Sequence, residues 1–161
     1  MQNITFTDEG FIFPNEKINV DLATLKTVFV DNFPNSTTRK TLYDNYLRYI
    51  DDFSKQITPN FTQWINGSFV TLKENPNDID FVTFIDVDIY EKCNSVIDNF
   101  WTISTYDIGL DAYIVKTFPQ NQDEYITQTI RYTNEWFDRF NTSRFDENGK
   151  KHLKGFFEIK I

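Results

Sequence analysis

Two aspartates, Asp78 and Asp80, lie two positions apart at the start of an apolar run at 81–85. The aromatic and β-branched residues of this run favour a strand. Side chains two apart in a strand point to the same face, and their Cα atoms are roughly 7 Å apart. Because Mg²⁺ and Mn²⁺ prefer oxygen ligands, two such carboxylates could share a metal ion. The spacing therefore predicts a divalent-metal site.

A small pair, Gly67-Ser68, follows a second apolar run at 61–65 and lies before that aspartate pair. Gly67 has no side chain to keep a phosphate away, and Ser68 can offer its N–H and its hydroxyl. We expect a short helix at 69–72 whose dipole would favour an anion. The loop then closes with Asn75-Pro76-Asn77, whose residues favour turns. An ordinary turn between two strands would show the same pattern, so this alternative stays open.

The order Gly67-Ser68, polar loop and Asp78-Ile79-Asp80 resembles the defining motif of the nucleotidyltransferase superfamily related to DNA polymerase beta. More closely, segments 64–71 and 75–80 are similar to a family of small bacterial nucleotidyltransferase-like proteins, as are Phe13-Pro14 and the segment from 136 to the end. The resemblance implies a nucleotidyltransferase-like fold, a Mg²⁺ or Mn²⁺ cofactor and a nucleoside triphosphate substrate such as ATP.

The resemblance also implies a third carboxylate on a neighbouring strand, which helps to hold a metal and can accept the proton of an attacking hydroxyl. We choose Asp111, because one intervening helix separates its strand from that of Asp80. Asp107, before a turn, ranks second. Asp86 and Asp88 are further rivals, but Asp86 lies at the far end of the strand, roughly 20 Å from Asp80. An ordinary solvated acid remains the alternative for Asp111.

The chain has 161 residues, of which 40% are hydrophobic and 17% aromatic, and this predicts one globular domain over 1–161 with an N-terminal arm at 1–35 packed on its core. The net charge of −8 argues against broad, non-specific nucleic-acid binding. No run is apolar enough for a membrane span, and the first residues do not form a secretory signal, so we expect a cytoplasmic protein. One cysteine and one histidine make a zinc site improbable.

Strand patterns at 61–65, 81–85, 110–115 and 155–161 alternate with helix patterns at about 36–57, 88–100 and 123–140. This order predicts an α/β (α+β) fold with a small mixed sheet and helices packed on it. More specific expectations are an Asp88 cap, a buried Cys93 thiol, inward-facing Ile126 and Ile130, and a final edge strand with one wet face. The basic cluster 150–154 is expected to be a solvated hairpin.

Two functions follow from this reading. The first is a metal-dependent nucleotidyltransferase that moves a nucleoside monophosphate from a triphosphate to a hydroxyl acceptor, with Asp78, Asp80 and Asp111 as catalytic and metal-binding residues and Gly67 and Ser68 on the phosphates. The alternative is a catalytically silent nucleotide-binding or regulatory module with a protein partner, for instance in a toxin–antitoxin system. A purely structural role ranks last, because it leaves the aspartate pair without a purpose.

Overall fold

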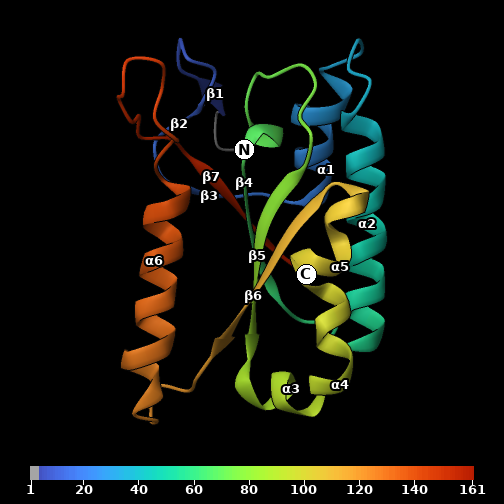
Figure 1. Cartoon of the computed structure of the whole chain (residues 1–161), viewed down its shortest axis with the longest axis vertical. Helices are drawn as coiled ribbons and strands as arrows, with labels where there is room; N and C mark the ends of the chain where they lie inside the picture. Colours follow the sequence, from blue (N-terminus) through green and yellow to red (C-terminus); the bar gives the residue numbers. More distant parts are fainter. Residues whose placement is uncertain (1–3) are drawn as a thin grey trace.

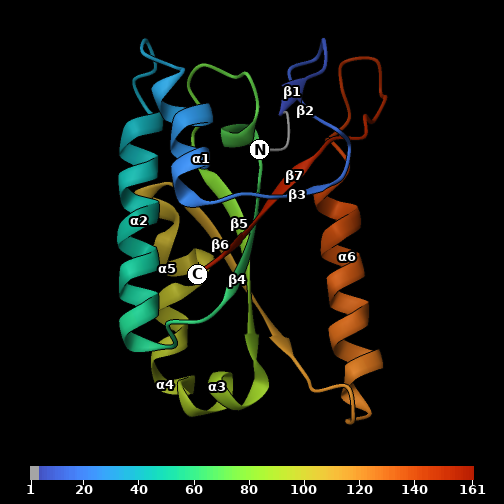
Figure 2. The same ribbon diagram turned by 180° about the vertical axis from the view of Figure 1, so that it is seen from behind.

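The computed structural model describes residues 4–161, which form a five-stranded mixed sheet between two layers of helix (Figures 1 and 2). The strands are β3 (Lys17–Asn19), β7 (Phe156–Lys160), β4 (Thr62–Asn66), β5 (Ile79–Asp86) and β6 (Leu110–Thr117), in that order across the sheet. β5 pairs with β6 in parallel, and β3 with β7 in parallel, whereas β4 is antiparallel to β5 and β7. The predicted mixed sheet with packed helices is confirmed.

One face of the sheet is covered by α2 (Arg39–Gln56), with α1 (Leu22–Lys26) and the π-helical turn η1 (Thr27–Asp31) beside it (Figure 2). The buried side chains of α2 recur every three or four positions, as in an amphipathic helix. They pack on Phe81, Phe157 and other residues in the larger hydrophobic core. The predicted helix at 36–57 is confirmed. The helical spacing of its apolar residues also predicts that Leu47 lies on the buried stripe, and this is wrong, because Leu47 is 36% exposed.

The opposite face is covered by α6 (Arg131–Phe140), which follows the π-helical segment η5 (Tyr125–Ile130). A second hydrophobic cluster joins this helix to the sheet through Trp64, Val82 and Phe140. The prediction that Ile126 and Ile130 face inward is wrong, since they are 72% and 40% exposed. A π-helix has more residues per turn than the 3.6 assumed from the sequence, so the apolar face rotates out of register.

β7 was expected to be an edge strand with one wet face, and this is wrong. It lies between β3 and β4, and α6 covers the face that carries Glu158, which is only 8% exposed. The Glu158 carboxylate accepts hydrogen bonds from Lys17 Nζ at 2.6 Å and Trp64 Nε1 at 2.8 Å. These bonds satisfy the buried carboxylate, so polar alternation did not mean solvent exposure at Glu158, although Lys160 on the same face is exposed.

The predicted arm at 1–35 begins outside the described residues, at 1–3. From residue 4 it carries β1 (Thr5–Phe6), β2 (Ile12–Phe13), β3 and α1, and four of its apolar side chains lie in the main core: Ile12, Ile18, Leu25 and Phe29. β1 and β2 form the separate two-stranded sheet.

The segment after β5 is a series of short helices, α3 (Val87–Lys92), α4 (Asn94–Ile97), η3 (Asp98–Phe100), α5 (Thr102–Thr105) and η4 (Tyr106–Ile108). Asp86 caps the first of them, because its side chain accepts from the Asp88 N–H at 2.8 Å, so the expected Asp88 cap is wrong. Cys93 lies at the break between α3 and α4 and is half-buried, not the core thiol that was expected. Within residues 4–161 we find no helix that combines the length and apolar character needed to span a membrane.

Candidate functional site

The turn after β4 is shaped by Gly67, whose φ of +79° and ψ of −166° fall in a region that is open to glycine almost alone. A Cβ built on Gly67 would lie 1.7 Å from Asp80 Oδ2. The Asp80 carboxylate therefore stands directly against the backbone of this turn. No residue with a side chain could occupy position 67 without displacing the Asp80 carboxylate.

Ser68 begins the single 3₁₀ turn η2 (Ser68–Val70), which is anchored by the buried side chains of Phe69 and Val70. The helix expected at 69–72 is thus one turn at 68–70. Such a turn is too short to build a macrodipole. Any recognition of an anion here would depend on the N–H groups and the hydroxyl of the turn itself.

The loop from 67 to 78 is fastened to α2 by Arg39, which is completely buried. Its guanidinium donates to the carbonyl oxygens of Phe69, Thr71, Lys73 and Glu74 in the loop, and also to that of Phe29. These bonds satisfy carbonyl groups that the loop cannot pair within itself. Arg39 therefore fixes the shape of the segment that joins the Gly67 turn to Asp78.

The three predicted carboxylates lie on the α6 face of the sheet. Asp78 directly precedes β5, Asp80 lies in β5, and Asp111 in β6 is the register partner of Asp80. Asp107 lies in η4 and is exposed, while Asp86 and Asp88 lie at the opposite end of β5. The structure thus brings together the aspartates chosen from the sequence.

The pKa values of Asp78 and Asp80 are raised above the ordinary value of an aspartate. Burial, followed by the charges of Asp78 and Asp111, raises the pKa of Asp80 to about 6. Burial and then the charge of Asp111 also raise the pKa of Asp78. Like charges held close together without full solvation disfavour ionisation, and a bound cation would remove this cost.

Two basic side chains near the acids were not singled out as site residues from the sequence. Lys154, placed in a solvated hairpin by the sequence reading, is only 8% exposed. Burial lowers its pKa to about 8, against the opposing effect of Asp80. Arg144 is exposed and acts on Asp78, Asp80 and Lys154 through its charge. The hairpin prediction fails for Lys154 because residues 141–155 fold back over the end of the sheet, where Lys154 N–H donates to Asn141 O.

Asn66, directly opposite Asp80 in the β4–β5 ladder, is the other residue that the sequence did not indicate. It is 5% exposed, and its Nδ2 donates to Phe140 O at 3.2 Å, which ties the end of α6 to the site. Its Oδ1 is buried and has no hydrogen-bond partner. Such an atom carries a desolvation cost unless a ligand or a water satisfies it.

The donor set fits a hard divalent cation. It consists of carboxylate oxygens, with the unpaired amide oxygen of Asn66 across the ladder. Among residues 4–161, no three His, Cys, Asp or Glu side chains are already arranged so that they could hold a metal ion. Binding would therefore require the carboxylates to converge by side-chain rotation.

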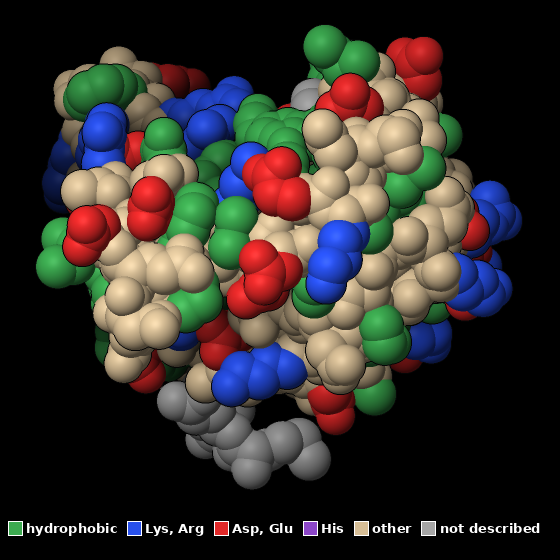
Figure 3. Space-filling model, turned by 90° about the horizontal axis from the view of Figure 1, so that it is seen from below, with side chains coloured by type: hydrophobic (Ala, Val, Ile, Leu, Met, Phe, Trp, Pro, Cys, Tyr) green, Lys and Arg blue, Asp and Glu red, His purple; other side chains and the backbone are tan. Residues whose placement is uncertain are grey.

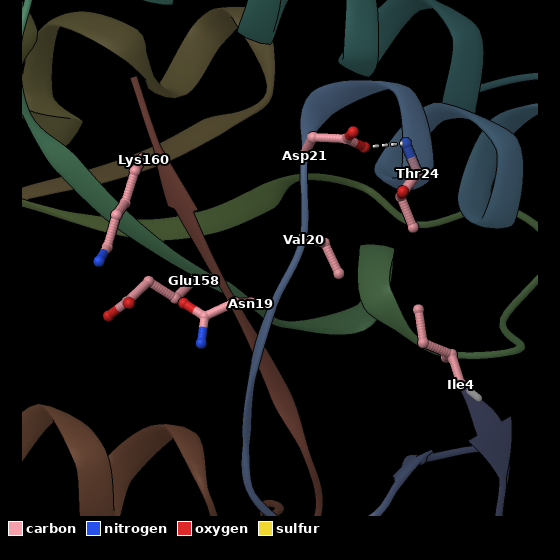
Figure 4. A pocket seen from close by; sticks show the side chains of 7 residues that line it. All are labelled: Ile4, Asn19, Val20, Asp21, Thr24, Glu158 and Lys160. Atoms are coloured by element: carbon pink, nitrogen blue, oxygen red, sulfur yellow. Dashed lines mark hydrogen bonds between the residues drawn. The ribbon is translucent and has the colours of Figure 1, made fainter. Parts of the chain in front are cut away.

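A separate pocket of about 550 Å³ lies where β3, β7 and α1 meet, and its lining includes Asn19, Asp21 and Glu158 (Figure 4). Asp21 accepts from the Thr24 N–H at 2.7 Å as the cap of α1. Glu158 is paired as described above. Asp21 and Glu158 therefore already form hydrogen bonds that stabilise the fold. The candidate site is the group formed by the Gly67 turn and the carboxylates of Asp78, Asp80 and Asp111.

Residues 4–160 match DUF6932, described as a family of unknown function. Neither the curated proteins nor the solved structures give a match to this chain. The resemblance to nucleotidyltransferases remains a prediction that these comparisons leave without a test.

Proposed function

Because the chain belongs to the DUF6932 family, whose function is unknown, its activity must be inferred from its own site, and we propose that it is a metal-dependent nucleotidyltransferase. It transfers a nucleoside monophosphate from a nucleoside triphosphate to a hydroxyl acceptor. In this proposal the protein acts in the cytoplasm, where nucleotides and magnesium are plentiful.

The observation that carries this proposal is the contact between the Gly67 turn and Asp80, combined with the register of Asp80 and Asp111. An anion bound by the turn would lie next to three carboxylates. Without a cation, the negative charges of these carboxylates would repel a triphosphate. A bound cation would reverse the local charge and favour the triphosphate. The unpaired Asn66 oxygen supports a bound ligand in the same place.

Each group then has a part in the reaction. The turn at Gly67 and Ser68 binds phosphate oxygens, and Lys154 and Arg144 balance their charge. The acceptor oxygen forms a bond to the α-phosphorus, the bond from that phosphorus to the β-phosphate oxygen breaks, and pyrophosphate leaves. Asp111 accepts the proton of the acceptor hydroxyl. Bound Mg²⁺ or Mn²⁺, held by Asp78, Asp80 and Asp111, would supply positive charge for the entering and leaving oxygens.

The alternative is a nucleotide-binding module that does not turn over and regulates a protein partner. This alternative keeps the same metal and phosphate contacts but needs no acceptor.

Thermal unfolding in the presence of Mn²⁺ and each nucleoside triphosphate tests the site directly. We expect a higher melting temperature only when metal and nucleotide are both present, because binding to the folded state stabilises it. Asp80→Asn should abolish the increase, whereas Asp107→Asn, an exposed acid outside the cluster, should keep it. No increase with any triphosphate would contradict the proposal, and an increase without pyrophosphate release would favour the silent module.

A further inference from the structure

The chain contains two Asn-Gly pairs, Asn66-Gly67 and Asn148-Gly149, and the structure gives them opposite surroundings. Such a pair can react with itself, because glycine has no side chain to keep its backbone nitrogen away from the neighbouring asparagine amide. The reaction needs this nitrogen to approach the side-chain carbon closely and in the right direction. Whether each pair reacts therefore depends on how firmly the fold holds it.

The fold holds Asn66 in a position that prevents this approach. Asn66 lies in β4 opposite Asp80, is 5% exposed, and its Nδ2 donates to Phe140 O at 3.2 Å. Asp80 also fills the space beside the Gly67 backbone, where an added Cβ would lie 1.7 Å from its Oδ2. Neither the side chain of Asn66 nor the backbone of Gly67 can rearrange without disturbing these contacts.

Asn148 and Gly149 lie in a turn of the 141–155 segment, near the top of the molecule in Figure 1, and both are exposed. A Cβ built on Gly149 would meet no atom within 4 Å. Asn148 N–H and Lys150 N–H donate to Asp146 Oδ1 at 2.9 and 2.8 Å, and Gly149 N–H donates to Asp146 O at 3.0 Å. A turn held by exposed hydrogen bonds opens locally more easily than a buried strand, so the side chain of Asn148 can reach the Gly149 nitrogen.

We propose that Asn148-Gly149 is a site of spontaneous covalent modification in the folded protein and that Asn66-Gly67 is protected. The Gly149 nitrogen forms a bond to Asn148 Cγ, and the bond from Cγ to Nδ2 breaks. The proton of the Gly149 nitrogen passes through water to Nδ2, which leaves as ammonia. Water then opens the cyclic imide at either of its carbonyl carbons. One opening gives aspartate, and the other gives isoaspartate, in which the main chain continues through Cβ and Cγ.

The shape of the 141–155 segment depends on this turn. Asp146 Oδ1 accepts from Asn148 N–H and Lys150 N–H, while its Oδ2 lies 3.0 Å from His152 Nε2. Isoaspartate inserts an additional carbon into the backbone after position 148. This insertion shifts Lys150 N–H relative to Asp146 Oδ1, so we expect the modified segment to be looser.

Both products also add a negative charge, and its place on the surface matters. The opposite end of the molecule, seen from below in Figure 3, shows acidic and basic side chains interspersed. The turn instead adjoins the basic cluster 150–154, whose Lys154 acts on Asp80 through its charge, as does Arg144. In the proposed function these basic side chains balance phosphate charge, and only this consequence rests on that function.

Peptide mapping by mass spectrometry tests the proposal on the intact chain after incubation at neutral and at mildly alkaline pH. We expect the peptide with Asn148 to gain the mass that replaces an amide NH₂ by OH, faster at the higher pH, whereas the peptide with Asn66 keeps its mass. Isoaspartate in the product would identify the cyclic imide, because direct hydrolysis gives only aspartate. In urea both pairs are released from the fold, and both should react.

Asn148→Gln is the matched control and should stay unmodified, because the larger ring that glutamine must form closes far more slowly. A position 148 that stays unmodified in the folded chain but reacts in urea would overturn the proposal, since the turn would then protect it. Equal modification of Asn66 and Asn148 in the folded chain would overturn the argument from burial. A product with aspartate alone would overturn the cyclic imide.

Limited digestion with trypsin measures the loosening of the segment. Incubated wild type should be cleaved faster after Arg144, Lys150 and Lys151 than fresh wild type, whereas incubated Asn148→Gln should be cleaved like the fresh protein. Asn148→Asp, which adds the charge without the additional carbon, should also be cleaved like fresh wild type. Equal cleavage of incubated and fresh wild type would overturn the loosening. Mapping and digestion need neither metal nor nucleotide, so their results stand or fall separately from the transferase proposal.

Discussion

The clearest consequence of the acidic cluster concerns Asp80→Asn in metal-free buffer. The pKa of Asp80 is about 6 in the fold, against an ordinary value of 3.8. This difference disfavours the ionised carboxylate in the folded state by about 3 kcal/mol. Asparagine keeps the shape of the side chain and removes the charge, so the variant should be more stable than the wild type at neutral pH. The figure is an upper bound, because Lys154 loses its neighbouring charge.

The raised pKa of Asp80 determines the direction in which the stability of the wild type changes with pH. Below about pH 3.8, Asp80 is protonated in both the folded and unfolded states, and the carboxylate costs no stability. As the pH rises from about 3.8 to 6, the unfolded chain releases its proton more readily than the folded one, and the wild type loses stability. Above about pH 6 the full cost is present.

Urea unfolding of both proteins from pH 4 to 8 measures the difference. We expect the free energies of unfolding to be similar at pH 4 and the variant to be favoured by up to about 3 kcal/mol at pH 7.5. Adding Mn²⁺ with a triphosphate should stabilise only the wild type. A difference that does not change with pH, or a variant that is less stable at pH 7.5, would refute the reasoning about the cluster.

Two further substitutions test the turn and its support. Gly67→Ala should destabilise the fold by about 1–3 kcal/mol, because alanine is strained in the backbone conformation of position 67. It should also abolish nucleotide binding, because the new Cβ displaces Asp80. Gly149→Ala is the control, since Gly149 also has a positive φ but lies in open space, and it should leave binding intact. Arg39→Lys should cost about 3 kcal/mol or more in urea unfolding, since one ammonium cannot satisfy five carbonyl groups, of which those of Phe29 and Phe69 are buried. A loss below about 1 kcal/mol would show that water replaces the guanidinium.

Local patterns in the sequence were sufficient to predict strands β4, β5, β6 and β7 and the placement of the acids, but not β3 or the order of the sheet. Alternation in a strand put Asp78 and Asp80 on one face, and the single crossover before β6 brought Asp111 into register with Asp80. Both inferences need only short-range geometry and the rule that parallel strands are joined by a crossover.

The features that were not predicted from the sequence depend on contacts between distant segments of the chain. β7 is interior because β3, from the other end of the chain, pairs with it, and no local pattern encodes that partner. Lys154 looks like one member of a basic run, yet the chain return at Asn141 buries it beside Asp80. Arg39 looks like an exposed helix residue, and only the fold shows that the loop carbonyls surround it. In each case the signal lies in a contact between distant segments, not in the residue's neighbours.

The most direct measurement of the central proposal is metal-dependent release of pyrophosphate from a nucleoside triphosphate in the presence of a hydroxyl acceptor. We expect release with the wild type in Mg²⁺ or Mn²⁺, no release after chelation, and losses of at least a hundredfold in Asp80→Asn and Asp111→Asn. Asp107→Asn should retain the wild-type rate. Release that survives Asp80→Asn, or no release with any triphosphate and hydroxyl acceptor while metal and nucleotide bind, would contradict a transferase centred on these aspartates.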